Sequence, residues 1–372
     1  MRILIIDKTA GLDSSHLRHQ AIAKLPDVEL HVLGPRHWIE SGRDIRWNPD
    51  NPDYHAIPGK MFFKDYYARA GYYSGLCRAI ASAKPDIIQI LEEPWSISAL
   101  QTLLAASVFA PNALILFYTW ENIYRDWQYP ARASRLYAMI DKLSHRRSAA
   151  AVCATKCAAD VLQKKGYSKK TAVIPYGIPD YFLDDVQTDA TVQRPFTLGY
   201  IGRIMHMKGI DLLLEAVKSI PNARMVIVGS GQDEEQFKQW SLDHGIQDRV
   251  DWRPPVQEHQ VPELMNQFDA FVLPSRSTPG WMEQLGRCAI EAMARQIPVI
   301  GSTSGAIPEV IGNAGLVFKE GSVESLIEQI LILRNNENLR HELGQKGRLR
   351  VQQQFTWDRF ASNICDFYRT LI

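Results

Sequence analysis

Short apolar runs alternate with longer amphipathic segments along nearly the whole chain of 372 residues. The runs are rich in Val, Ile and Leu and mostly lack alternation, which is typical of strands buried on both faces. Repeated strand–helix units of this kind predict a parallel sheet covered by helices. In the first half the predicted strands are 3–7, 28–34, 85–91, 113–119, 149–154 and 172–175, and the predicted helices include 15–24, 97–109, 131–144 and 158–165.

The alternation stops at 179–195, a polar stretch bracketed by prolines. We interpret this stretch as a linker between two domains, a number that the chain length also favours. The pattern then restarts and predicts a second doubly wound sheet. Its predicted strands are 196–201, 224–228, 270–273, 298–301 and 315–318, and its predicted helices include 210–220, 234–244, 285–295, 323–335 and 339–354.

The charge balance and the apolar runs exclude several classes of protein. The chain has 42 basic and 41 acidic residues and a net charge of +1, so no overall attraction to nucleic acid is expected. The first apolar run ends at Asp7, too early for a signal peptide, and no run reaches the ~18–20 apolar residues that span a bilayer. Five cysteines without a CxxC pair predict reduced thiols. We expect a cytoplasmic protein, either free or bound at the inner face of a membrane.

Ligands on such sheets bind at the carboxyl ends of the strands, so the loops there are candidate sites. The loop after 196–201 reads GRIMHMKG and contains Gly202, Arg203 and Lys208. Two cations before a helix N-terminus suit a diphosphate, because the free amides there also attract negative charge. A solvated turn with incidental charge explains this loop equally well when it is taken alone.

The loop after 224–228 reads VGSGQDEE. Its residues Gly229, Ser230 and Gly231 predict a tight turn from strand to helix, where the backbone can approach a ligand closely. A purely structural turn explains the same residues, so this loop is a weak signal by itself.

The strongest signal is a pair of acidic residues, Glu283 and Glu291, with seven residues between them. In a continuous helix they would lie roughly 12 Å apart on nearly one face, which matches the reach from a sugar ring to a ribose. We expect Glu283 before the helix beside the sugar, and Glu291 within it, accepting hydrogen bonds from ribose hydroxyls. The amides of Gln284, Leu285 and Gly286 are expected to meet the sugar or phosphate.

A solvated acidic face is the alternative for this pair, but the apolar neighbours of Glu291 favour a ligand-facing carboxylate. The loop after 298–301 adds Ser304, Gly305 and Ala306, which could line the sugar pocket.

Together these loops resemble those of the retaining glycosyltransferases of the GT-B fold, family 4 (glycosyl transferases group 1), in a bacterial polysaccharide-type subgroup. The family's EX7E element is present as Glu283 and Glu291, and its phosphate-binding pair as Arg203 and Lys208. The stretches LPSRSTPGWMEQLGRCAIEAMARQIPVIGSTSGAIPEVI and FTWDRFASNICDFYRTLI are also similar to the family. The resemblance covers the C-terminal half well and the N-terminal half loosely.

The resemblance implies two Rossmann-like doubly wound α/β domains that face a central cleft. It assigns residues 1–180 with 356–372 to an acceptor-binding domain and residues 190–355 to a donor-binding domain. The last helix is expected to cross back onto the N-terminal domain.

The resemblance also implies the chemistry. A hexose-type sugar would move from a UDP-sugar or GDP-mannose to a hydroxyl of a saccharide or lipid-linked acceptor, with retained configuration, in cell-surface polysaccharide or glycoconjugate synthesis. Arg203 and Lys208 would neutralise the departing diphosphate, Glu291 would hold the ribose and Glu283 would contact the sugar. Neither a metal nor another cofactor is expected, because charge stabilisation at the leaving group carries much of such catalysis.

Acceptor candidates in the first half also follow predicted strands. Many family members carry a His after the fourth strand, but this chain reads LILFYTWENIYRDW there, with Trp120 and Glu121 in the loop. Glu93 follows a neighbouring strand, and Gly11 is a weak match to the family's Gly-rich loop. The two carboxylates could bind acceptor hydroxyls or polarise the nucleophile, and a structural role is equally compatible with the sequence.

Residues 60–78 mix basic and aromatic side chains. This composition could contact a membrane interface or a lipid phosphate, stack sugars, or pack a core. Two other functions also fit the chain as a whole, a nucleotide-sugar epimerase and a nucleotide-sugar binding module without catalysis.

Overall fold

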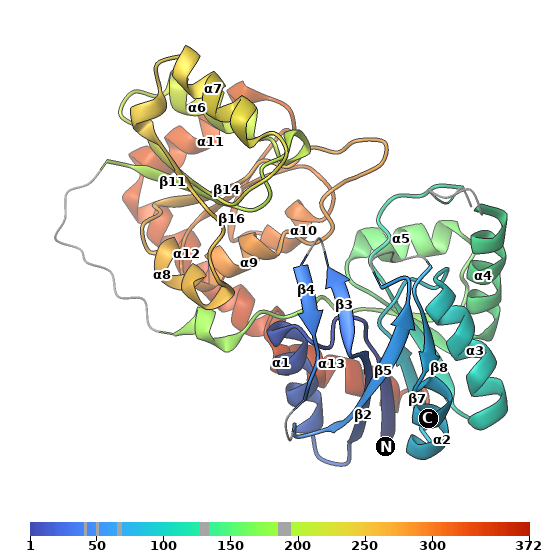
Figure 1. Cartoon of the computed structure of the whole chain (residues 1–372). Coiled ribbons are helices and arrows are strands. Elements are labelled where there is room, and N and C mark those ends of the chain that lie inside the picture. Colours follow the sequence, from blue (N-terminus) through green and yellow to red (C-terminus); the bar gives the residue numbers. More distant parts are fainter. Residues whose placement is uncertain (41–42, 50–51, 65–68, 127–128, 130–133, 185–194) are drawn as a thin grey trace. The chain divides into compact units, whose positions relative to one another are not determined.

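The protein divides into two compact α/β units in the computed structural model (Figure 1). The first unit comprises Met1–Gly177 and Trp357–Ile372, and the second comprises Ile178–Thr356. The structure describes all residues except 41–42, 50–51, 65–68, 127–128, 130–133 and 185–194.

The first unit is built on an eight-stranded sheet of order β10-β9-β8-β7-β1-β2-β5-β6. All neighbouring strands are parallel except β5 and β6, which are antiparallel. A separate antiparallel hairpin is formed by β3 and β4. The strands are β1 (Arg2–Ile6), β2 (Glu29–Pro35), β3 (His37–Glu40), β4 (Arg43–Arg46), β5 (His55–Phe62), β6 (Gly71–Ser74), β7 (Ile87–Ile90), β8 (Leu114–Thr119), β9 (Ala150–Cys153) and β10 (Lys170–Val173).

Helices cover both faces of this sheet, which explains why its central strands lack polar alternation. One face forms a core with α1 and α13, and the other forms a core with α2, α3 and α5. The helices are α1 (Asp13–Ala23), α2 (Leu76–Ala83), α3 (Ile97–Phe109), α4 (Ser134–Arg147), α5 (Lys156–Lys164) and α13 (Trp357–Arg369).

Helix α13 carries the end of the chain back onto the first unit, as the sequence predicted (Figure 1). Its side chains Trp357, Phe360 and Ile364 are buried in the core beside α1. The Tyr368 hydroxyl at its far end donates a 2.9 Å hydrogen bond to Gln89 Oε1 on β7. The helix is therefore part of the first unit's core.

The second unit contains a six-stranded, wholly parallel sheet of order β13-β12-β11-β14-β15-β16. Its strands are β11 (Thr197–Ile201), β12 (Arg224–Val228), β13 (Val250–Arg253), β14 (Ala270–Leu273), β15 (Val299–Ser302) and β16 (Gly315–Phe318). Its α-helices are α6 (Ile210–Ser219), α7 (Glu234–Asp243), α8 (Val261–Met265), α9 (Arg287–Ala294), α10 (Ile307–Ile311), α11 (Val323–Asn335) and α12 (Glu337–Gln354).

The strands that the sequence did not predict lie toward the sheet edges. β5 contains Pro58 and Gly59, which usually break a strand. Pro58 pairs with β2 alone, because β6 joins β5 only from Lys60 onward. Proline has no backbone N–H, but on the side of β6 this costs no hydrogen bond between strands. β13 is an edge strand with the polar sequence VDWR. Neither strand shows the long apolar run of a central strand.

The start of the stretch interpreted as a linker is packed structure. Residues 180–183 form a single 3₁₀ turn within the second unit, and Phe182 is fully buried. Arg295 Nη1 donates to the carbonyl of Asp184 at 2.8 Å. The linker interpretation was wrong for 180–183, because the polar neighbours of Phe182 hid its role in the core. Residues 185–194 of the predicted linker lie outside the described residues.

Candidate functional site

The strand order of the second unit reverses between β11 and β14. From β11 the chain runs outward through β12 and β13, whereas from β14 it runs the other way through β15 and β16. At such a switch point the loops leaving the two central strands diverge and open a crevice at their carboxyl ends. The loop after Ile201 and the loop after Leu273 are the two that meet there.

A salt bridge joins these two loops. Lys208 Nζ lies 2.7 Å from Glu283 Oε2, and Ser275 Oγ donates to the same oxygen at 2.7 Å. The Lys208 ammonium also lies 4.6 Å from the centre of the Trp281 ring. The structure therefore brings together two of the predicted site residues, 75 positions apart in sequence.

Glycines allow the loops to interlock. A Cβ at Gly229, whose φ is +147°, would stand 1.9 Å from the carbonyl oxygen of Gly202. A Cβ at Gly305, whose φ is +54°, would stand 2.0 Å from the carbonyl oxygen of Glu283. Any side chain at either position would push two loops apart. These glycines are thus required by contacts between loops, a reason that the sequence did not reveal.

Glu291 lies in α9 and is buried, with 7% of its surface exposed. Arg287, one turn earlier, places its Nε 2.9 Å from Glu291 Oε1 and also pairs with Glu258. Burial raises the pKa of Glu291, and the charge of Arg287 acts against that rise. Glu283 lies before α9, which begins at Arg287, so one acid is on a loop and the other within the helix.

The pKa values of Cys288 and Tyr200 are shifted by several of the predicted residues. Burial and the carboxylates of Glu291 and Glu283 raise the pKa of Cys288 to about 12, and the charge of Lys208 opposes this shift. Burial and Glu283 likewise raise the pKa of Tyr200, against the charge of Arg203. The four charged residues therefore act on the same small region at the end of β11 and the start of α9.

The remaining predicted residues lie around this crevice. Arg203 and Gln284 are exposed, and Leu285 is buried. Gly286 has φ +72° and precedes the first turn of α9. The backbone carbonyl of Ser230 accepts a 2.9 Å hydrogen bond from the amide of Ile204, which joins the loop after β12 to the loop after β11.

Sequence reasoning missed Ser275, Trp281 and Arg287. Ser275 comes two residues after β14, so the rule that ligands bind at carboxyl ends could have selected it. Trp281 and Arg287 carry no comparable signal, because their roles depend on where Lys208 and Glu291 lie in space.

In the first unit, the predicted acceptor carboxylates are buried at the carboxyl ends of β7 and β8. Glu93 accepts from the Trp120 amide and the Thr119 hydroxyl, each at 2.7 Å. Glu121 pairs with Lys165, whose ammonium also lies 2.9 Å from Asp141 Oδ2. The structure thus places Glu93, Trp120 and Glu121 side by side and gives both carboxylates partners within the fold.

Gly11 is explained by packing. A Cβ there would stand 2.7 Å from Cγ2 of Ile45 in the β3–β4 hairpin. Next to this loop, Asp7 pairs with Arg18, and Lys8 pairs with Glu92, all four being buried. The sequence did not predict this charged lining at the end of β1.

The segment 60–78 divides between core and surface. Met61 and Tyr72 are buried, whereas Phe62 and Phe63 are 36% and 59% exposed. Tyr66 and Tyr67 lie outside the described residues. No helix in the described part of the chain is both long and apolar enough to cross a membrane.

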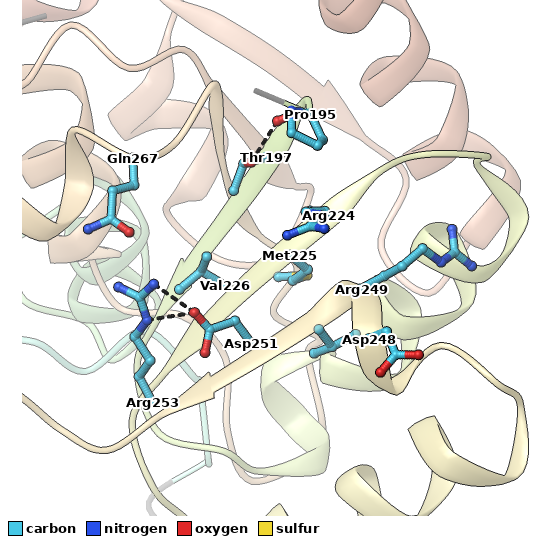
Figure 2. Close-up of a pocket in the computed structure, with 11 residues that line it drawn as sticks. Pro195, Thr197, Arg224, Met225, Val226, Asp248, Arg249, Asp251, Arg253 and Gln267 are labelled. Carbon is cyan, nitrogen blue, oxygen red and sulfur yellow. Dashed lines mark hydrogen bonds and ion pairs between the residues drawn. The ribbon is translucent and has the colours of Figure 1, made fainter. Parts of the chain in front are cut away.

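A hollow in the second unit lies away from the crevice (Figure 2). Its lining residues Thr197, Arg224 and Arg249 stand at or just before the amino ends of β11, β12 and β13. Arg253 and Asp251 point toward each other in Figure 2, with Nη2 and Oδ2 2.6 Å apart. The residues that line the hollow include none from the loops after Ile201 and Leu273, which leave the opposite ends of their strands.

Residues 185–350 match the family model described as glycosyl transferases group 1. Because of this similarity, residues 185–350 are called the group 1 domain. This domain lies within the range of the second unit and includes the loops after β11, β12, β14 and β15.

Curated relatives match over a similar stretch. The GDP-mannose-dependent alpha-(1-6)-phosphatidylinositol monomannoside mannosyltransferase of Mycobacterium tuberculosis is 30% identical over 211 residues, which cover 53% of this chain and 55% of that protein. The capsular polysaccharide biosynthesis glycosyltransferase CapM of Staphylococcus aureus is 30% identical over 187 residues, 48% of this chain and 47% of that protein. The chain spans about half the length of the curated relatives it matches.

The likeness in structure covers both units. HepE of Anabaena, solved in complex with UDP, has a TM-score of 0.70 at 15% sequence identity, with 100% of each chain covered. The group 1 domain and the first unit together have the GT-B fold that the sequence predicted.

The buried carboxylate of Glu93 generates a pH prediction. Burial, followed by the charge of Glu121, raises the pKa of Glu93 to about 8 from 4.5. The folded state therefore holds a proton that the unfolded chain releases, and stability should fall as pH rises between these two values. Glu93→Gln should remove this fall, because a neutral amide can accept from Trp120 and donate to the Thr119 hydroxyl.

Urea unfolding at pH 5 and pH 9 measures the effect. From pH 5 to pH 9, we expect the free energy of unfolding of Glu93→Gln to rise by more than about 1 kcal/mol relative to that of the natural chain, since one unit of pKa difference is worth about 1.4 kcal/mol. The exposed Glu263→Gln is the matched control. An equal pH dependence in the natural chain and Glu93→Gln would refute the shift.

Proposed function

We propose that this protein is a metal-independent, retaining glycosyltransferase that uses a nucleoside-diphosphate sugar. The observation that carries the proposal is the contact of Lys208 with Glu283 at the switch point of the group 1 domain. An ammonium has three N–H donors, and Glu283 occupies one, so Lys208 can hold a diphosphate oxygen while it stays paired. Arg203, exposed on the same loop, would add the second positive charge.

The same geometry supports a division of roles around the donor. Glu283 would accept hydrogen bonds from hydroxyls of the sugar. Glu291 would accept hydrogen bonds from the ribose hydroxyls through Oε2, since Oε1 faces Arg287. The amides of Gln284, Leu285 and Gly286, at the start of α9, would meet the sugar or the phosphate. Gly202, Gly229, Ser230 and Gly231 would form the wall contributed by the first two loops.

In the proposed reaction the bond from the sugar C1 to the diphosphate oxygen breaks while a bond from C1 to the acceptor hydroxyl forms on the same face. The acceptor's proton passes to the leaving phosphate oxygen. Lys208 and Arg203 would stabilise the negative charge that grows there, and this is where an enzyme gains most from fixed charges. No step requires a metal ion.

For the substrates, we propose a hexose donor carried by UDP or GDP and a saccharide or lipid-linked acceptor of cell-surface polysaccharide or glycoconjugate synthesis. The relative from M. tuberculosis is GDP-mannose-dependent, CapM is named for capsular polysaccharide biosynthesis, and HepE was solved with UDP. The first unit would bind the acceptor, with Glu93, Trp120 and Glu121 at the carboxyl ends of its strands. A stabilisation screen with UDP, GDP and ADP identifies the base, because a ligand stabilises the folded state according to its occupancy.

Lys208→Ala should lower turnover of the donor by about 10²–10³-fold, by analogy with the loss of one oxyanion donor. Donor turnover is measured with UDP-glucose and GDP-mannose, with and without an acceptor. Lys218→Ala, which removes a lysine from the surface of α6, is the matched control. Near-normal turnover in Lys208→Ala would exclude its phosphate role. Tight donor binding without turnover in the natural chain would favour a binding module, and interconversion of donor sugars without acceptor would favour an epimerase.

Glu291→Ala should weaken nucleotide binding by about 10–100-fold, the effect of removing a charge-assisted hydrogen bond. The fold should survive, because Arg287 keeps Glu258 as a partner. Titration calorimetry with the nucleotide identified by the screen measures the affinity, and the exposed Glu328→Ala is the control. An unchanged affinity in Glu291→Ala would rule out the ribose contact.

For location, we propose a cytoplasmic protein that touches the inner face of the membrane through 60–78, where Phe62 and Phe63 are exposed. Replacing both with Ser should reduce co-sedimentation with phosphatidylglycerol vesicles several-fold. Leu242→Ser, an exposed apolar residue of α7, is the control. Absence of vesicle binding by the natural chain, or equal binding by the double variant, would contradict membrane contact.

A further inference from the structure

Three metal-ligating side chains meet at the amino ends of β2 and β5. Glu29 and His31 are two residues apart on β2 and therefore share a face of the sheet. His55, the first residue of β5, stands directly opposite His31 in the parallel register. The two histidines line a hollow beside Ser82 of α2.

The three side chains are already close to a coordinating arrangement. His31 Nε2 lies 2.9 Å from Glu29 Oε1, and the two imidazole rings are stacked with centroids 4.6 Å apart. One ligand atom from each residue lies within 4.8 Å of the other two. Bonds of about 2.0–2.1 Å in a tetrahedral zinc site bring ligand atoms to roughly 3.3 Å from one another. The ligand atoms therefore need to come closer by only a short distance. His55 can move its ring nitrogen toward the other two ligands by rotating about its side-chain bonds, because it is exposed.

The donor set selects the class of ion. Two imidazoles and one carboxylate suit Zn²⁺, whereas Mg²⁺ and Ca²⁺ prefer oxygen ligands. Three protein ligands leave the fourth zinc position for a water molecule or another small ligand. His31 is only 9% exposed, so one ligand is held firmly by the fold while the other two reach it from the surface.

We propose that Glu29, His31 and His55 form a zinc-binding site that fastens β5 to β2. The site is independent of the proposed transferase chemistry, whose first-unit residues Glu93 and Glu121 stand at the opposite, carboxyl ends of the strands. β5 gains most from such a cross-link, because it carries Pro58 and Gly59 and has only one neighbouring strand at this end.

Equilibrium dialysis of the chelator-treated full chain against Zn²⁺ tests the site, with Mg²⁺ as the comparison ion. The exposed thiol of Cys77 is first removed by Cys77→Ser, so that it does not compete for zinc. We expect one zinc ion per chain, no binding of Mg²⁺, and an affinity for zinc at least about 10-fold lower in His55→Ala and in Glu29→Gln.

The matched control is His341→Ala. His341 and Glu337 also form an exposed His–Glu pair, with Nε2 and Oε1 3.8 Å apart, and this pair belongs to no three-residue cluster among the described residues. Circular dichroism checks that each variant is folded. A zinc-dependent rise in melting temperature should appear in the Cys77→Ser chain and after His341→Ala is added to it, but not after His55→Ala is added. No zinc binding by the Cys77→Ser chain, or the same loss with His55→Ala and with His341→Ala, would overturn the proposal.

Discussion

The contact between Lys208 and Glu283 depends on the reversal of strand order between β11 and β14. A parallel sheet brings loops from adjacent strands to the same edge, and the reversal turns the following helices to opposite sides, so the two loops face each other across an open space. The salt bridge can form only because this topology joins residues that are far apart in sequence. Close backbone contacts of Gly229 with Gly202 and of Gly305 with Glu283 then hold the neighbouring loops against the two loops that carry the salt bridge.

Burial controls the charges in both units. Glu291 is buried beside Arg287, and Lys165 is buried between Glu121 and Asp141, so each charge has a partner that offsets the cost of leaving water. Paired buried charges of this kind keep a fixed direction, which a catalytic or binding site requires and a solvated side chain does not have. The pairs that Lys165 makes with Glu121 and Asp141 also hold the ends of β8 and α5 against α4.

The sequence identified most of the fold because buried parallel strands have a local signature. The runs at β1, β7, β8 and β9 are mostly apolar, with Gln89 as the polar exception inside β7, since both faces of each strand meet helices. β5, β6 and β13 lack that signature. β6 and β13 are edge strands, and β5 has only β2 beside it at its amino end, so these strands keep polar or bend-forming residues. The 3₁₀ turn at 180–183 was hidden by its polar neighbours, and only Phe182 marks it as packed structure.

The amino-acid sequence by itself determined the two α/β sheets, the return of the last helix and the loops that carry Arg203, Lys208, Glu283 and Glu291, because periodicity and motif spacing are local properties. Only the tertiary structure decided that Lys208 meets Glu283 and Ser275, that Arg287 faces Glu291, and that Glu93 and Glu121 share one buried network. It also decided that His31 stands opposite His55. The physical reason is that strand order and register set which distant residues become neighbours, and no local pattern in the chain specifies either one.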